Sequence, residues 1–356
     1  MSLPQTVKLI AAFVDPSTGA IVAPPSGVSQ VSFALKDTSA FTGFAMNAGS
    51  ETTADFSLAT ATASFSADHT ARVELLCHDY GGFTTVQASA GDQTAEMRVP
   101  KDDNGNWLPD GGWKVIANGQ VIGEIMDTGL ATDADEDVNP MGNGVDGDGL
   151  VNFEEFRGFA VRGEHRRTNP FQKDLFIYSE LPQNIGDAIN LPVTKHSIFQ
   201  NQMDADRVIN FNRSNSGFGG SIPTIFDQHA LMVIDGGFKL IGRSSPVFGE
   251  TSVVGSPNVQ TGPIKIYTLS IRFASPPNNN IFNVDPFDDE KTRQTIGHEV
   301  GHGVNIVHRF PNQYPPGLLS VMVTGYFMVT SNINDPAWNN IPHTYDMTDE
   351  RQLQVR

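Results

Sequence analysis

The first hundred residues carry the alternation of apolar and polar positions that is typical of β-strands. In Thr84–Ala90, every second residue from Val86 onward is apolar, and turn-forming Asp and Gly residues flank the segment. Because no helical periodicity interrupts the region, the pattern predicts an antiparallel β-sandwich over residues 1–100. Three earlier segments of this region are also predicted to be strands: Thr6–Val14, Val28–Leu35 and Thr60–Phe65.

The chain from residue 166 to residue 356 combines strand-like segments with a helical segment, which predicts an α+β domain. Its longest alternating run, Ile264–Phe273, is predicted to be a strand that precedes the helical segment. Acidic residues gather just before that segment, at Asp288 and Asp289, where carboxylates complement the positive end of a helix dipole. Further strands are predicted at Lys173–Tyr178, Ala230–Ile234 and Phe238–Ile241.

Between these two predicted domains, residues 101–165 form a strongly acidic region. One interpretation is a solvated linker. The other is an EF-hand-like calcium-binding region, because Asp and Asn recur there at the spacing of oxygen ligands in such loops. Neither loop is complete, since Trp107 replaces the turn glycine of the first and Gly144 the first ligand of the second. The candidate calcium ligands are Asp102, Asn104, Asn106 and Asp110 in the first loop, Asp146, Asp148, Asn152 and Glu155 in the second, and Asp133, Asp135 and Asp137, which could supply missing carboxylates.

The composition limits the kind of partner that the protein could have. The chain has 356 residues and a formal charge of −17, which argues against nucleic acid or an anionic membrane as the main partner. No stretch approaches the roughly 18 apolar residues of a membrane span, and the short apolar run after Lys8 does not predict a signal peptide in this chain. The single cysteine, Cys77, excludes an intramolecular disulfide framework.

The strongest candidate chemistry lies in the run HEVGHGVNIVH, which spans His298–His308. On a helix, His298 and His302 lie on the same face, so both imidazoles can reach one metal ion while Glu299 projects beside them. His308 is too far along a straight helix to join them, so the helix must end and turn before it. Asn305 stands at that point, and Asn readily adopts the left-handed conformation that ends helices.

This run resembles the motif of the metzincin zinc peptidases, HExxHxxGxxH, with Asn305 in place of the usual glycine. The resemblance implies that His298, His302 and His308 ligate zinc and that Glu299 is the general base. A third ligand from an acidic residue downstream is the alternative. The chain has no Asp or Glu between Arg309 and Asn334, which favours His308.

Metzincins also place a methionine in a tight turn beneath the metal, and Met322 in the run LLSVMVTGYF is the candidate. Met328 and Met347 are alternatives, and an ordinary core methionine is another. A tyrosine approaches the oxyanion in some members, which makes Tyr326 a candidate for that role. In this family an edge strand of the sheet pairs with extended peptide, and the resemblance suggests Ile264–Phe273 for that strand.

Two weaker resemblances concern the rest of the chain. The predicted N-terminal sandwich is similar to the immunoglobulin-like modules of secreted bacterial proteins. The acidic region resembles the DxNGNxxxD and DGDGLxNxEE calcium repeats that lie between modules of bacterial extracellular proteins. Both resemblances favour a secreted or cell-surface location, most consistent with a bacterial source.

Taken with its resemblances, the sequence predicts a multidomain, secreted zinc endopeptidase that is stabilised by calcium. The predicted domains are an immunoglobulin-like sandwich (1–100), an EF-hand-like calcium region (101–165) and a metzincin-like catalytic domain (166–356). We expect a monomer that requires Zn²⁺ and Ca²⁺ and cleaves a protein or peptide substrate. The alternative is a calcium-dependent adhesion or binding protein with a structural or vestigial zinc site.

Overall fold

The computed structural model describes two compact units that are rich in β-strands and contain few helices. Of the described residues, the first unit takes those from 5 to 134 and from 151 to 168, and the second takes those from 135 to 150 and from 169 onward. The acidic region 101–165 is therefore divided between the two units. The described residues are 5–36, 59–77, 83–106, 108–117, 120–131, 134–139, 146–183, 188–189, 191–202, 230–242, 245–254, 259–260, 262–274 and 286–304.

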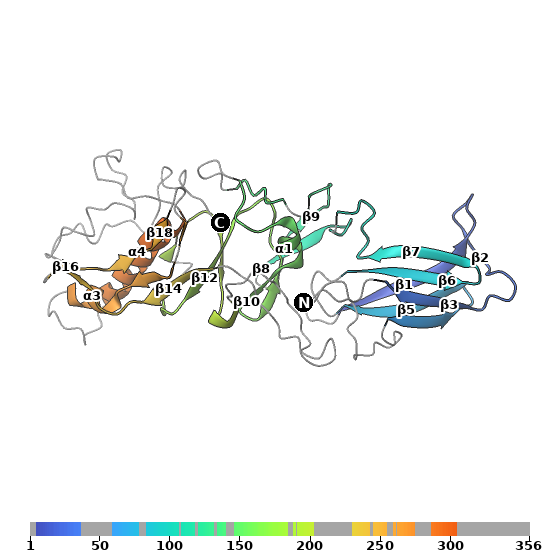
Figure 1. Cartoon of the computed structure of the whole chain (residues 1–356), viewed down its shortest axis with the longest axis horizontal. Coiled ribbons are helices and arrows are strands. Elements are labelled where there is room, and N and C mark those ends of the chain that lie inside the picture. The colour runs from blue at the N-terminus through green and yellow to red at the C-terminus, as the bar shows by residue number, and fades with distance from the viewer. Residues whose placement is uncertain are drawn as a thin grey trace. The chain divides into compact units, whose positions relative to one another are not determined.

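The N-terminal part of the first unit consists of two antiparallel sheets that share one core (Figure 1). Burial alternates along the strands, so that Val31, Phe33 and Leu35 of one sheet face Leu9 and Leu75 of the other. The four strands predicted here are confirmed, whereas the immunoglobulin-like subtype stays a prediction. One sheet holds β1 (Gln5–Val14), β2 (Ile21–Val22) and β5 (Thr70–Cys77); the other holds β3 (Gln30–Leu35), β4 (Thr60–Ser64), β6 (Thr84–Ala90) and β7 (Gln93–Val99).

The remainder of the first unit has a small core of its own around Leu108, Trp113 and Phe156. The rings of Trp113 and Phe156 lie 5.9 Å apart, and Trp113 Nε1 donates a hydrogen bond of 3.0 Å to the backbone oxygen of Thr168. This bond satisfies the buried indole N–H. The elements are β8 (Trp113–Ala117), β9 (Gln120–Ile125), α1 (Asn152–Arg157), β10 (Phe159–Val161) and β11 (Glu164–Arg166).

His165, in β11, is a buried histidine of this unit. Its Nε2 donates to the backbone oxygen of Arg157 at 2.5 Å, and a Cβ at Gly158 would lie 2.4 Å from the same nitrogen. Burial, together with the nearby charge of Arg167, lowers the pKa of His165 to about 3. The folded unit therefore holds this imidazole neutral.

Acidification from pH 6.5 toward pH 3 is expected to destabilise the first unit through His165. In this range the unfolded chain binds a proton on the imidazole and the folded chain does not, so protons favour the unfolded state. One such group contributes up to about 1.4 kcal/mol per pH unit. Urea unfolding of the His165→Gln variant across this range should give a shallower pH dependence than the wild type. Equal slopes for the two proteins would contradict the assignment.

A five-stranded sheet with a helix packed against it forms the main body of the second unit. The strand order is β13-β12-β14-β20-β17; the first four strands are parallel and β17, at the edge, is antiparallel. Ile177, Val233 and Ile264 of the sheet pack in one core with Ile296 and Val300 of the long helix. The elements are β12 (Asp174–Ser179), β13 (Thr194–Ser197), β14 (Leu231–Asp235), β17 (Gly249–Glu250), β20 (Ile264–Ile266), α3 (Thr268–Ala274) and α4 (Pro286–Gly303).

Two short hairpins and one 3₁₀ turn complete the described part of the second unit. The pairs are β15 (Leu240–Ile241) with β16 (Ser245–Pro246) and β18 (Val253–Val254) with β19 (Val259–Gln260), and the 3₁₀ turn is Gln200–Gln202. Among the helices that the structure describes, none has the length and apolar character needed to cross a membrane.

The long strand predicted at Ile264–Phe273 is wrong beyond its first three residues. The chain leaves β20 at Ile266 and forms α3, in which Ile271 N–H donates to Tyr267 O at 3.0 Å. The alternating apolar positions of this run include Tyr267 and Ile271, which are four residues apart. Residues at that spacing also lie on one face of a helix, so the pattern fits a helix equally well. Because β20 lies between β14 and β17, it is also not the edge strand; β17, which was not predicted, occupies that position.

Candidate metal centres

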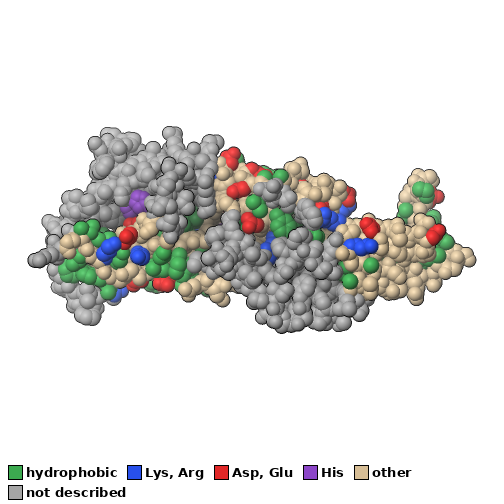
Figure 2. Space-filling model, in the orientation of Figure 1, with side chains coloured by type: hydrophobic (Ala, Val, Ile, Leu, Met, Phe, Trp, Pro, Cys, Tyr) green, Lys and Arg blue, Asp and Glu red, His purple; other side chains and the backbone are tan. Residues whose placement is uncertain are grey.

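Helix α4 contains His298 and His302 on consecutive turns, as the spacing predicted, and Glu299 directly follows His298. The ring centroids of His298 and His302 lie 4.8 Å apart, and the ring planes are nearly perpendicular, at 85°. Their i, i+4 spacing brings them together on one helix face. On the face shown in Figure 2, a histidine side chain (purple) reaches the surface in the region of α4 and β18. The helix therefore offers two adjacent imidazoles to a metal ion.

Glu299 is held against the edge strand β17 and the residue that follows it. The hydroxyl of Thr251 lies 2.7 Å from Glu299 Oε2 and 2.9 Å from its backbone oxygen, and can donate to either. Gly249 leaves room for the carboxylate, because a Cβ there would lie 2.5 Å from Glu299 Cγ. Burial raises the pKa of Glu299 to about 7; the Thr251 hydrogen bond opposes this rise and the charge of Glu250 adds to it.

Glu250, the neighbour of Glu299 in this arrangement, has polar partners of its own. Its Oε2 accepts hydrogen bonds from Tyr267 Oη at 2.6 Å and from Lys239 Nζ at 2.5 Å. These bonds, first that of Lys239 and then that of Tyr267, hold the pKa of Glu250 below its usual value. Glu250 therefore stays ionised near neutral pH while the buried Glu299 has a raised pKa.

The other residues of the predicted zinc site lie outside the described part of the chain. Helix α4 ends at Gly303, and the N–H of Val304 still donates to Val300 O at 3.0 Å. The end of the helix thus falls just before the position where the sequence requires a turn. The residues outside the described part are Asn305, the proposed third ligand His308, the methionine candidate Met322 and the oxyanion candidate Tyr326.

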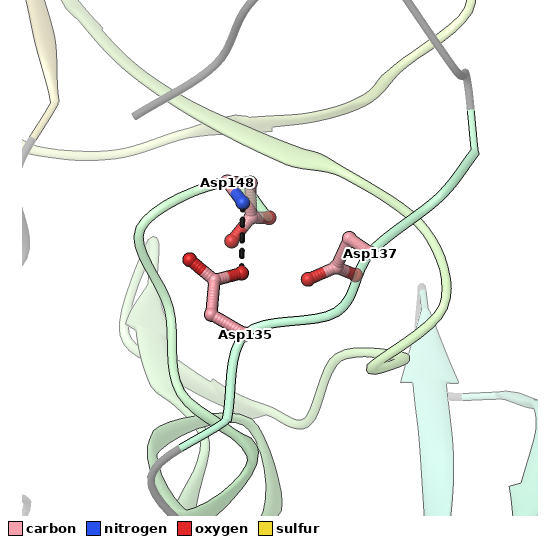
Figure 3. A group of neighbouring side chains, drawn as sticks. All are labelled: Asp135, Asp137 and Asp148. Atoms are coloured by element: carbon pink, nitrogen blue, oxygen red, sulfur yellow. Dashed lines mark hydrogen bonds between the residues drawn. The ribbon is translucent and has the colours of Figure 1, made fainter. Parts of the chain in front are cut away.

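A second candidate centre is the aspartate cluster, which consists of Asp135, Asp137 and Asp148 (Figure 3). One carboxylate oxygen from each residue lies within 4.8 Å of the others, so the cluster could bind a metal ion. Asp148 belongs to the second predicted loop, and Asp135 and Asp137 belong to the run that was expected to supply missing carboxylates. Among their predicted co-ligands, Asp133 is outside the described residues, Asp146 is exposed and outside the cluster, and Asn152 and Glu155 belong to α1 of the first unit.

Asp137 and Asp148 are buried, Asp135 is partly buried, and a glycine turn shapes the cluster. Asp135 accepts two backbone hydrogen bonds of 2.9 Å, from the N–H of Asp148 to Oδ1 and from the N–H of Gly149 to Oδ2. Gly147 has φ of +86°, and a Cβ there would lie 2.5 Å from the Asp135 carboxylate. Burial raises the pKa of Asp148 to about 8 and that of Asp137 well above its usual range, where the charge of Asp148 adds to the effect.

The aspartate cluster is bonded to the start of the central strand β12. Asp148 Oδ2 accepts the backbone N–H of Asp174 at 2.6 Å, and Lys173 Nζ donates to the backbone oxygen of Gly147 at 2.7 Å. Asp174 itself pairs with His196 of β13, whose ring stacks on Phe176 at 4.6 Å. The lysine, Asp174 and His196 are all buried, so the cluster joins a buried polar network at one end of the sheet.

The polar side chains of the first predicted calcium loop form hydrogen bonds within the loop and with Asp127 outside it. Asp102 Oδ1 accepts the N–H groups of Gly105 at 2.7 Å and Asn106 at 3.1 Å, the pattern of an Asx turn. The side-chain amides of Asn104 and Asn106 donate to Asp127, at 2.7 and 3.0 Å. Sequence reasoning missed Asp127 because it lies beyond the predicted loop. Asp110 accepts the N–H of Asp103 at 2.9 Å.

Comparison with known proteins returned no match to this chain, whether to a family model, a curated protein or a solved structure.

Proposed function

We propose that the protein is a secreted zinc endopeptidase. The observation that carries the proposal is the pair of adjacent imidazoles, His298 and His302, with the buried carboxylate of Glu299 on the same helix. Imidazole nitrogen is a preferred zinc ligand, and two of them on successive turns fit the ion. By the resemblance of the motif, His308 would complete the set and leave a coordination position open.

In peptide hydrolysis the zinc ligands and Glu299 would have separate roles. Zinc, when bound to His298, His302 and His308, would supply Lewis-acid polarisation of the scissile carbonyl and activation of a water molecule. Glu299 would take a proton from the attacking water and deliver it to the leaving amine. Since the Thr251 hydroxyl is within bonding distance of Oε2, Oε1 is the oxygen of Glu299 that is left for proton transfer. A pKa of about 7 suits both directions of that transfer.

The edge strand β17 supports a substrate that binds as an extended chain. Among the described residues it pairs only with β20, on one side. An unpaired edge can accept an extended peptide through backbone hydrogen bonds. Because Gly249 of this strand is against Glu299, a peptide paired there would pass close to the general base.

The alternative is a calcium-dependent binding protein with a vestigial zinc helix. The β-sandwich and the aspartate cluster favour it, because both are found without any need for catalysis. A buried general-base carboxylate with its own positioning contacts has no purpose in such a protein, and this favours the peptidase.

The purified full-length protein is expected to bind about one zinc ion per chain and to cleave casein in a chelator-sensitive manner. Metal analysis and a casein assay before and after treatment with 1,10-phenanthroline, with zinc added back, measure both properties. His302→Ala should lose zinc and activity. His69→Asn, which changes an exposed histidine of the sandwich, serves as the matched control and should keep both. Cleavage that persists without zinc would overturn the proposal.

A further inference from the structure

We propose that Asp135, Asp137 and Asp148 bind one divalent cation of the calcium class, and that this ion holds their segment against the start of β12. The inference deepens the calcium requirement of the proposed function, but it does not depend on peptidase activity. It narrows the sequence prediction to one ligand set, which combines Asp148 of the second loop with two of the three aspartates offered as missing carboxylates and excludes Asp146.

The environment of Asp137 is what points to a ligand. Its side chain is fully buried, with 0% exposure, and neither of its carboxylate oxygens has a hydrogen-bond partner among the described residues. Figure 3 shows this carboxylate directed toward those of Asp135 and Asp148. Burying a charged carboxylate without a partner costs folding free energy. Because the Asp137 carboxylate also faces two other carboxylates, either bound protons or a cation must offset the charge of the group.

The charges around the cluster do not neutralise it. Lys173 brings one positive charge against three carboxylates, and its Nζ donates to the backbone oxygen of Gly147. Asp174 adds a fourth carboxylate, which is paired with His196. A divalent cation among the three oxygens would supply the missing charge at short range.

The donor atoms indicate the class of cation. Three carboxylates with no sulfur or imidazole in the cluster are hard oxygen ligands, which suit Ca²⁺ or Mg²⁺ rather than zinc. Calcium is the better fit because it accepts irregular ligand arrangements. Magnesium requires near-ideal octahedral geometry and keeps several of its waters, for which a fully buried Asp137 leaves little room.

A bound cation would stabilise the sheet through two hydrogen bonds that connect the cluster segment to β12. Asp148 Oδ2 accepts the N–H of Asp174, and Gly147 O accepts the ammonium of Lys173, both at the entrance to β12. Strand β12 pairs with β13 on one side and β14 on the other. Without the ion, mutual repulsion would push the three carboxylates apart and loosen both bonds. The second unit should therefore lose stability when calcium is removed.

The test uses the full-length protein in a Glu299→Gln background, which prevents self-digestion. After chelation and restoration of one equivalent of zinc, calcium alone is titrated by calorimetry, with magnesium in a parallel series. Asp137→Asn should weaken the tight calcium site about tenfold or more, because ligand charge tunes affinity. Asp146→Asn, an exposed change in the same acidic run, is the control and should bind as the wild type does.

Hydrogen exchange tests the link to the sheet. Calcium should slow exchange of the β12 amides in the wild type but not in Asp137→Asn, and should leave β3 and β6 of the sandwich unchanged. In calcium-free buffer Asp137→Asn should melt no lower than the wild type, because it removes a buried repulsive charge. In calcium the wild type should melt higher.

Two results would overturn the inference. One is unchanged calcium affinity in Asp137→Asn, and the other is the absence of calcium binding in the wild type, which would mean that protons occupy the cluster. Failure of the peptidase proposal would leave these outcomes unaffected, since none of them measures cleavage.

Discussion

Replacing Glu299 with glutamine is expected to abolish peptide cleavage while the zinc content stays unchanged. Glutamine has the same shape and can still accept the Thr251 hydrogen bond, but it cannot take a proton from water. Loss of general acid–base catalysis lowers rates by roughly 10²–10⁴-fold. Initial rates on a quenched peptide, together with zinc analysis of the same samples, measure the effect.

The matched control for this experiment is Glu290→Gln on the same helix. Glu290 pairs with Arg293 at 2.8 Å, lies one residue before the buried part of α4 begins at Lys291, and has no role in the proposed mechanism. Its activity should match the wild type. Substantial cleavage by the Glu299→Gln protein would exclude Glu299 as the general base, whatever the zinc content.

Replacing Thr251 with valine is expected to lower kcat about tenfold to a hundredfold with little change in KM. Valine keeps the shape and removes the only hydrogen bond to Glu299 Oε2 that the structure describes. A hydrogen bond to a charged group contributes about 1.5–3 kcal/mol, and roughly 1.4 kcal/mol corresponds to a tenfold change in rate. Steady-state kinetics on a defined peptide separate kcat from KM.

Rescue by Thr251→Ser distinguishes positioning of Glu299 from general damage to the fold. Serine restores the hydroxyl without the methyl group, so kcat should return to near the wild-type value. Zinc content and melting temperature should be similar in all three proteins. If Thr251→Val retains full kcat, or if serine fails to restore it, the hydroxyl does not position the base.

The local elements of this protein were predictable because each depends on a short sequence pattern. Strand β6 matches the predicted segment Thr84–Ala90, since alternate apolar residues must face the core of a sandwich. The imidazole pair of α4 follows from the i, i+4 spacing in the same way. After Ile266 the sequence fits both a strand and a helix. Contacts with other segments favour the helix there, such as the hydrogen bond of 3.0 Å from Leu269 N–H to Gly237 O.

The membership of the aspartate cluster was not predictable from spacing. The predicted loop grouped Asp148 with Asp146 and with two residues of the following helix, whereas the backbone turns at Gly147 with positive φ and brings Asp148 back to Asp135. The position of β12 beneath this turn, through the N–H of Asp174, completes the arrangement. The EF-hand-type spacing predicted oxygen ligands of the right kind and named Asp135 and Asp137 as possible additional carboxylates, but it did not show which of the candidates meet Asp148.

By itself, the sequence determined elements with one clear periodicity, such as β6 and α4, and the chemistry that one helix face presents, because periodicity acts over a few neighbouring residues. The tertiary structure alone decided which distant groups meet. Thr251 and Gly249 reach Glu299 from forty-eight or more residues away in sequence, and Asp137 is buried against Asp148 from another turn of the chain. Such contacts depend on how strands pair and helices pack, and no local pattern encodes that pairing.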